Sequence, residues 1–176
     1  RMQGKVFNAE GFPRYRDKIE QRSYPDPAPM PRNFKKLFHT QAQQVDGHSV
    51  FTIAPRHGKP SIQVIYTHGG AYINALQWIH WSIIQQLVER VGAQVTVPIY
   101  PLAPEHTYRD AFPMLEGVYR KVLHETPNDK IVLCGDSAGG GFALAQALHF
   151  RDMGLRLPDR IVLFSPWVDI TMSNPD

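Results

Sequence analysis

The stretch Lys130-Ile-Val-Leu-Cys-Gly-Asp-Ser-Ala-Gly-Gly-Gly141 decides the fold of this 176-residue chain. The apolar run 131–134 leads directly into Gly135-Asp-Ser-Ala-Gly139, and an alanine- and leucine-rich helix is predicted from Ala138 to about Met153. This order is typical of a nucleophile elbow, in which a serine lies on a tight turn between a buried strand and a helix. Ser137 would then adopt strained backbone angles, and side chains at positions 135 and 139 would clash with the neighbouring strand and helix.

A second glycine cluster, Tyr66-Thr-His-Gly-Gly-Ala-Tyr72, ends another apolar run upstream, Ile62-Gln-Val-Ile-Tyr66. An enzyme that transfers acyl groups needs backbone N–H donors for the tetrahedral oxyanion, and successive glycines present such amides without obstruction. We therefore expect Gly69 and Gly70 to donate to an oxyanion, with the Ala138 amide as a third donor. The alternative is that this cluster is an ordinary loop.

Four motifs in this chain together resemble those of the hormone-sensitive-lipase-type esterases of the α/β-hydrolase superfamily. They are His68-Gly-Gly-Ala-Tyr72, Tyr100-Pro-Leu-Ala-Pro-Glu105, Gly135-Asp-Ser-Ala-Gly-Gly140 and Ser165-Pro-Trp-Val-Asp169. The resemblance runs from about residue 40 to the end of the sequence. It implies a serine carboxylester hydrolase that acts on short-chain acyl esters with no metal or organic cofactor, and it makes His68 a structural member of the loop. Gly135, Asp136 and Gly139 support the elbow.

Alternating apolar segments predict an α/β fold with a mostly parallel sheet and helices on both faces. A β-hairpin is expected at 37–45 and 49–54, turning at Asp46-Gly47. The strands and helices that follow are expected at 62–66, 76–91, 93–100, 108–124, 131–134, 138–153 and 160–164. In the family that the motifs resemble, about two more strands would follow, so we expect a core that is truncated before its last strands.

Two domains are expected: residues 1–34 as an N-terminal arm or cap segment, and residues 35–176 as the incomplete α/β-hydrolase core. The arm contains a proline-rich stretch, Ser23 to Pro31, which is expected to be extended. By the resemblance, the aromatic residues Phe7, Phe12, Tyr15 and Tyr24 would dock over the active site as part of a cap. A loosely packed arm is the alternative.

The serine needs a base and an acid, and in α/β-hydrolases these follow it in the sequence. The only later histidine, His149, lies on the helix that runs away from Ser137 and is excluded as the base. His106 follows the Pro104-Glu105 turn near the cleft, and we expect it to have an orienting or surface role rather than to serve as the base. Asp169 follows the strand 160–164, and we expect it to brace a loop rather than to serve as the acid. Base and acid are therefore expected beyond residue 176.

Three functions remain open at this stage. The first is the serine esterase, the second a catalytically incomplete remnant or binding module that keeps the oxyanion loop, and the third an amidase or formamidase on the same fold. Tyr72 either lines a substrate pocket or belongs to the core, while Trp78 and Trp81 are expected in the core. In the resembling family a late edge strand often forms a homodimer, which leaves that assembly open for a full-length chain.

Composition narrows the classes of partner. The net charge of +3 is small and no Lys/Arg run is present, so nothing points to nucleic acid. The only cysteine, Cys134, is expected to be a core residue; a single cysteine allows no intrachain disulfide, which agrees with a reducing cytoplasm. No apolar run reaches the ~18 residues of a membrane span, and no signal peptide opens the chain.

Overall fold

Strands and helices alternate as the apolar pattern predicts. The computed structural model of the protein describes residues 11–169 and residue 171. Its elements are α1 (Gly11–Glu20), α2 (Phe34–Leu37), β1 (Phe38–Val45), β2 (His48–Pro55), β3 (Ile62–Thr67), α3 (Trp78–Val91), β4 (Gln94–Pro98), α4 (Tyr108–Glu125), β5 (Lys130–Asp136), α5 (Ser137–Asp152) and β6 (Arg160–Phe164). Every element predicted between residues 37 and 164 is present, with bounds that differ by a few residues.

One mixed sheet contains the six strands in the order β1-β2-β4-β3-β5-β6. The pairs β4–β3, β3–β5 and β5–β6 are parallel, whereas β1–β2 and β2–β4 are antiparallel. Asp46 and Gly47, which join β1 to β2, have φ angles of 50° and 78°. Positive φ at both positions is the backbone of a tight hairpin turn, which Asp-Gly favours. The predicted α/β fold and its mostly parallel sheet are confirmed.

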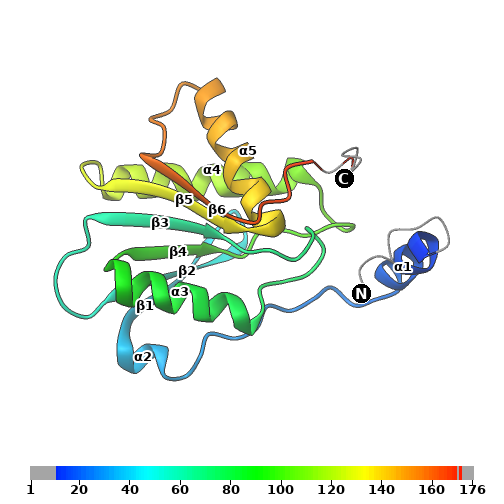
Figure 1. Ribbon diagram of the computed structural model, residues 1–176, viewed down its shortest axis with the longest axis horizontal. Helices are drawn as coiled ribbons and strands as arrows, with labels where there is room; N and C mark the ends of the chain where they lie inside the picture. Colours follow the sequence, from blue (N-terminus) through cyan, green and yellow to red (C-terminus); the bar gives the residue numbers. More distant parts are fainter. Residues whose placement is uncertain (1–10, 170, 172–176) are drawn as a thin grey trace.

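Helices cover both faces of the sheet (Figure 1). On one face α3 packs through Trp81, Ile84 and Val88 onto β-strand side chains such as Val64 and Val95. On the other face, α4 and α5 bury Leu115, Tyr119, Phe142 and Phe150 against Ile65 and Leu133. Neighbouring residues of one strand, such as Val64 and Ile65, therefore point into different cores, as the two-residue period of a strand requires.

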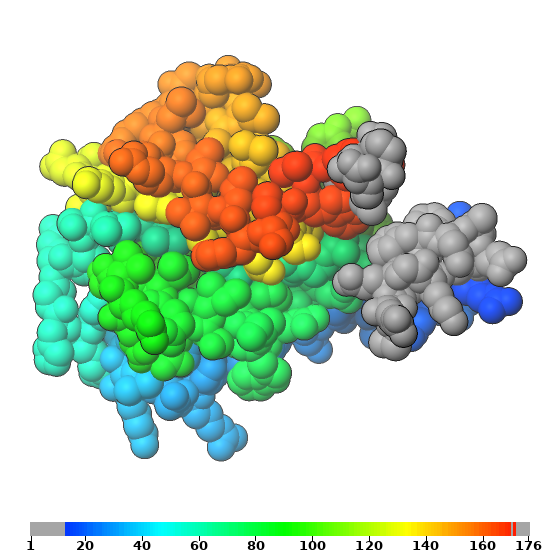
Figure 2. Space-filling view, viewed as in Figure 1, coloured from blue at the N-terminus to red at the C-terminus, as the bar shows by residue number. Residues whose placement is uncertain are grey.

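The two ends of the described chain lie differently relative to the sheet: α1 stands apart from it, and β6 is one of its edge strands (Figure 1). In Figure 1, α1 stands apart from the sheet, and the proline-rich segment after it runs as an extended chain toward α2. Phe7 lies outside the described residues, and so does the side chain of Phe12. At the other end β6 forms the edge of the sheet and lies on the outside of the molecule, coloured orange to red in Figure 2, with Ile161, Val162 and Phe164 exposed.

The tryptophan predictions hold only in part. Trp81 is 1% exposed and belongs to the core, as expected, but Trp78 is 60% exposed. Trp78 is the first residue of α3, at the end of the helix, and its side chain is not covered by the core, so its prediction as a core residue was wrong. Among the helices of residues 11–169, none combines the length and the apolar character that crossing a membrane requires.

Candidate active site

Ser137 lies at the sharp turn between β5 and α5. Its φ is +49°, a left-handed conformation that non-glycine residues rarely adopt, and the residue is exposed. A Cβ on Gly135 would come within 2.3 Å of the Gly139 carbonyl oxygen, and a Cβ on Gly139 within 2.0 Å of the Thr67 carbonyl oxygen. The strained serine and the two crowded glycines are the geometry predicted for a nucleophile elbow.

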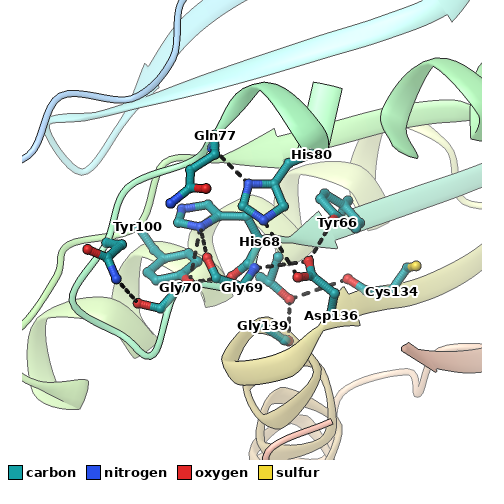
Figure 3. A network of polar contacts seen from close by, with 12 residues as sticks. Tyr66, His68, Gly69, Gly70, Gln77, His80, Tyr100, Cys134, Asp136 and Gly139 are labelled. Carbon is teal, nitrogen blue, oxygen red and sulfur yellow. Dashed lines mark hydrogen bonds and ion pairs between the residues drawn. The ribbon is translucent and has the colours of Figure 1, made fainter. Parts of the chain in front are cut away.

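Asp136, which precedes the serine, directs its carboxylate at the loop between β3 and α3 instead of at its own helix. We call this loop, residues 68–77, the glycine loop. It is the N-cap residue of α5, yet its side chain makes no capping hydrogen bond. Asp136 Oδ1 instead accepts from the Gly69 amide at 2.9 Å and from the Tyr66 hydroxyl at 2.5 Å (Figure 3). Its Oδ2 lies 3.5 Å from His80 Nε2. The first amides of α5, including that of Ala138, therefore have no side-chain cap and are free to face an anion.

This contact concerns one expected oxyanion donor. The Gly69 N–H, which was expected to donate to an oxyanion, donates to Asp136 Oδ1 instead. The glycine itself is still needed, because a Cβ at this position would lie 2.3 Å from Asp136 Oδ2. Gly69 therefore joins the glycine loop to the elbow.

The peptide groups that follow are each held by their carbonyl oxygen. His68 Nδ1 donates to the Gly69 carbonyl at 2.7 Å. The Gly70 carbonyl accepts from the Asn74 backbone amide at 2.8 Å and from Asn74 Nδ2 at 3.2 Å. In a trans peptide group the N–H points opposite to the C=O, so the amides of Gly70 and Ala71 point away from these contacts. In the part of the chain that the structure describes, neither amide has a protein acceptor.

The loop carries concentrated backbone strain. Ala71 and Tyr72 have φ angles of 56° and 63°, and Gly70 has a φ of 128°. A Cβ at position 70 would lie 2.6 Å from the Asn74 carbonyl oxygen. Consecutive left-handed residues other than glycine persist only where surrounding contacts hold them, and they concentrate at functional sites. One such contact is the Ala103 amide, which donates to the Tyr72 carbonyl at 2.9 Å.

Burial and hydrogen bonds fix the charge states of two side chains that contact the glycine loop, His68 and Asp136. Burial lowers the pKa of His68 to about 4, so its ring is neutral where it stacks on Tyr100 with ring centres 4.4 Å apart. Burial opposes ionisation of Asp136, but the bonds from His80, Tyr66 and the Gly69 amide outweigh it and hold the pKa of that carboxyl below its usual range. His68 is thus a neutral structural residue and Asp136 an ionised one.

Cys134, in β5 before the elbow, is a buried core residue, as expected. Burial and the nearby Asp136 charge raise the pKa of its thiol to about 12. The thiol therefore stays protonated near neutral pH and is a poor nucleophile.

An apolar cavity of about 570 Å³ lies between the glycine loop, α4 and α5. Tyr72, Phe112, Phe142 and Trp167 form aromatic walls, and His106 lies at its margin. The Trp167 amide donates to the Ser137 carbonyl at 2.8 Å, so the segment after β6 is attached directly to the elbow. Tyr72 thus lines this cavity and also packs against the core, and its role in a substrate pocket stays a prediction.

The two residues that follow Ser137 and were weighed as base and acid make other contacts. No hydrogen bond joins Ser137 Oγ to another side chain within residues 11–169. His149 Nε2 pairs with Glu116 Oε2 at 3.1 Å, between α4 and α5. Asp169 Oδ1 accepts from the Thr171 amide at 2.9 Å, which braces its loop as predicted. No cluster of His, Cys, Asp or Glu suited to a metal ion occurs in the described residues.

Sequence reasoning missed Ala71, Asn74 and His80 at this site. It also missed Arg22, whose Nη1 donates to Asn74 Oδ1 at 3.3 Å. The hydrogen-bond partners of the carbonyl oxygens in the glycine loop are known only from the three-dimensional contacts, which the sequence motifs do not show. His80 had one local signal, since it lies three residues after Gln77 and completes the capping box of α3.

Comparison with known proteins agrees with this geometry. The family model described as alpha/beta hydrolase fold matches residues 64–176. The chain is 35% identical over 133 residues to LipR of Mycobacterium tuberculosis, a candidate acetyl-hydrolase, covering 75% of this chain and 43% of that protein. The chain therefore spans less than half the length of this curated relative.

Two crystal structures extend the comparison. A candidate esterase from Staphylococcus aureus superimposes with a TM-score of 0.80 at 28% identity, covering 96% of this chain and 57% of that chain. An esterase of the bacterial hormone-sensitive lipase family superimposes with a TM-score of 0.69 at 26% identity, covering 92% of this chain and 51% of that chain. Since the family model matches most of the sequence and these structures share its fold, the chain belongs to the α/β-hydrolase fold family.

Proposed function

We propose that the protein is a serine carboxylester hydrolase in which Ser137 is the nucleophile. The observation that carries this proposal is the φ of +49° at Ser137, on a turn whose flanking glycines leave no room for a side chain. Such strain has a role if it presents the hydroxyl to a substrate. The esterases and the acetyl-hydrolase among the relatives support the same reaction class.

The oxyanion donors follow from the peptide groups of the glycine loop. The amides of Gly70 and Ala71 have no acceptor within the described residues, and the Ala138 amide lies in the uncapped first turn of α5. These three amides form the proposed oxyanion hole, so Ala71 replaces Gly69 among the donors expected from the sequence. The positive end of the α5 dipole adds to the same stabilisation.

The reaction would proceed through an acyl-enzyme. Ser137 Oγ attacks the ester carbonyl carbon while a general base takes the hydroxyl proton, and the carbonyl oxygen becomes the oxyanion. Collapse of this intermediate breaks the bond to the alcohol, which leaves with the proton returned by the base. Water then repeats the sequence and releases the acid. In this proposal the base and its acid partner come from outside the described residues.

The substrate would be a small ester with an apolar part. The cavity beside the elbow, walled by Tyr72, Phe112, Phe142 and Trp167, is suited to an alkyl or aryl group. A cytoplasmic location and a homodimer remain predictions.

The test is hydrolysis of p-nitrophenyl acetate and butyrate by the protein and by Ser137→Ala. We expect the variant to lose on the order of 10⁶ in kcat, since breaking the serine–histidine unit of such enzymes costs about that much. Ser165→Ala is the matched control, because Ser165 also directly follows a parallel strand with a positive φ, 45°, but does not begin a helix. Equal turnover by Ser137→Ala and the unaltered protein would exclude Ser137 as the nucleophile.

A further inference from the structure

The extended segment after α1 binds the loops that surround the elbow. We call residues 22–31 the N-terminal strap. The Tyr24 hydroxyl accepts from the Leu102 amide at 3.0 Å. The Ala28 amide donates to the Leu76 carbonyl at 2.7 Å, and Trp81 Nε1 donates to the Ala28 carbonyl at 2.9 Å. The strap therefore contacts the glycine loop, the loop after β4 and α3.

Arg22, at the start of the strap, joins two of these loops with one guanidinium group. Its Nη2 donates to the carbonyl of Ile73 and, at 3.4 Å, to that of Ala103. Its Nη1 donates to Asn74 Oδ1 at 3.3 Å. No carboxylate pairs with Arg22 in residues 11–169, so a partly buried cation is held by neutral oxygens alone. The planar fork of arginine suits such a bridge, which the single point charge of lysine does not reproduce.

Asn74 connects Arg22 to the candidate oxyanion hole through hydrogen bonds at both ends of its side-chain amide. Its Oδ1 accepts from Arg22, and this fixes which end of the side-chain amide faces the loop. Its Nδ2 therefore faces the Gly70 carbonyl and donates to it at 3.2 Å. Because the peptide group is rigid, holding the Gly70 oxygen also sets the direction of the Ala71 N–H.

We propose that Arg22 is a positioning residue, which acts through Asn74 to orient the Gly70–Ala71 peptide group in the strained glycine loop. The inference deepens the proposed function and rests on it, since the oriented amide is one of the proposed oxyanion donors. It gives the N-terminal strap a role in transition-state stabilisation, although no strap residue touches the substrate.

The kinetic test compares Arg22→Met, Arg22→Lys and Asn74→Ala in ester hydrolysis. Because a small misplacement of catalytic groups costs up to about 10²-fold, we expect Arg22→Met to lower kcat by about 10- to 100-fold with a smaller change in KM. Arg22→Lys should not restore kcat. The double variant Arg22→Met/Asn74→Ala should lose no more than the worse single variant, since both changes break one chain of contacts.

Arg56→Met is the matched control. The Arg56 guanidinium also bridges two backbone carbonyls, those of Lys35 and Lys36, but it does so at α2, away from the glycine loop. This variant should keep the kcat of the unaltered protein. Equal effects of Arg22→Met and Arg56→Met, or additive losses in the double variant, would overturn the proposal.

Amide hydrogen exchange separates this inference from the proposed function. The amides of Ile73 and Asn74 donate to the Gly70 carbonyl and report on the loop without any turnover. We expect their exchange to be faster in Arg22→Met and Asn74→Ala than in Arg56→Met. An unaltered protein that hydrolyses no ester would refute the proposed function, and unchanged exchange in both loop variants would refute the positioning role. Should Arg22→Met not fold, Asn74→Ala decides the second question.

Discussion

The Asp136 side chain could either cap α5 or bind the glycine loop, and in the structure it binds the loop. An aspartate at a helix N-cap usually accepts from the helix's own first amides, but Asp136 accepts from Gly69 and Tyr66 instead. The consequence is twofold: the glycine loop is fixed to the elbow, and the first turn of α5 keeps its amides open. Stability of the loop and availability of donors thus arise from one side chain.

The ionisation of Asp136 makes part of the stability depend on pH. Its pKa is lower in the folded protein than its ordinary value of about 3.9. Its stabilising contribution is therefore complete above that ordinary value and is lost as the pH falls through the folded-state value. We expect Asp136→Asn to be less stable than the unaltered protein at pH 7, with a difference that shrinks below about pH 4.

Denaturant unfolding of both proteins across that range measures the difference. Asp152→Asn, on the exposed end of α5, is the control and should show no such trend. A gap between Asp136→Asn and the unaltered protein that stays constant with pH would contradict the assigned ionisation.

Gly69 has a role that depends on its lack of a side chain. In Gly69→Ala the new Cβ would lie 2.3 Å from Asp136 Oδ2 and 3.0 Å from the Asp136 carbonyl oxygen. Relief requires the glycine loop to move away from the elbow, so we expect kcat to fall at least about tenfold. Gly47→Ala is the comparison, since it adds backbone strain at a φ of 78° with no atom within 4 Å. Similar kinetics for the two variants would show that the close approach to Asp136 does not matter.

At the scale of elements, the first turn of α3 is attached to the elbow. His80 Nδ1 accepts from the Gln77 amide at 2.8 Å, so the ring proton lies on Nε2, which faces Asp136. One imidazole thus caps a helix and supports the carboxylate that holds the glycine loop. The ring is nearly buried, with 6% of the side chain exposed.

Replacement of His80 tests this attachment. His80→Ala removes the cap and leaves the Gln77 amide without its acceptor, so we expect a loss of about 1–2 kcal/mol in the free energy of unfolding. His149→Ala breaks another histidine–carboxylate pair, but one on the partly exposed surface between α4 and α5, and should cost under about 1 kcal/mol. Urea unfolding measures both, and equal losses would contradict the central position assigned to His80.

The elements themselves were predictable because each has a local signal. The two-residue period of β1 and β2, the Asp46-Gly47 turn and the glycine at the end of α3 all act over a few residues. The elbow was predictable for the same reason, since strand, turn and helix are contiguous. The exposure of Trp78 was not, because Trp78 is the first residue of α3 and the apolar pattern alone does not say whether the core covers the end of the helix.

At the scale of the whole molecule, the site lies at the carboxyl ends of the parallel strands, where such sheets bind ligands. The glycine loop follows β3, the elbow follows β5 and the Trp167 segment follows β6. Contacts around the site join residues far apart in sequence, as between Trp167 and Ser137 and between Arg22 and Ala103. The motifs therefore predicted which loops lie around Ser137, while the proposed choice of Ala71 over Gly69 as a donor required the three-dimensional contacts.

The central claim, that Ser137 carries the acyl group during turnover, is tested most directly by mass spectrometry of the acid-quenched protein. After brief reaction with p-nitrophenyl butyrate, the account predicts a butyryl group on the peptide that contains Ser137, and none in Ser137→Ala. A butyryl group on another residue, or steady hydrolysis of the ester by Ser137→Ala, would contradict it.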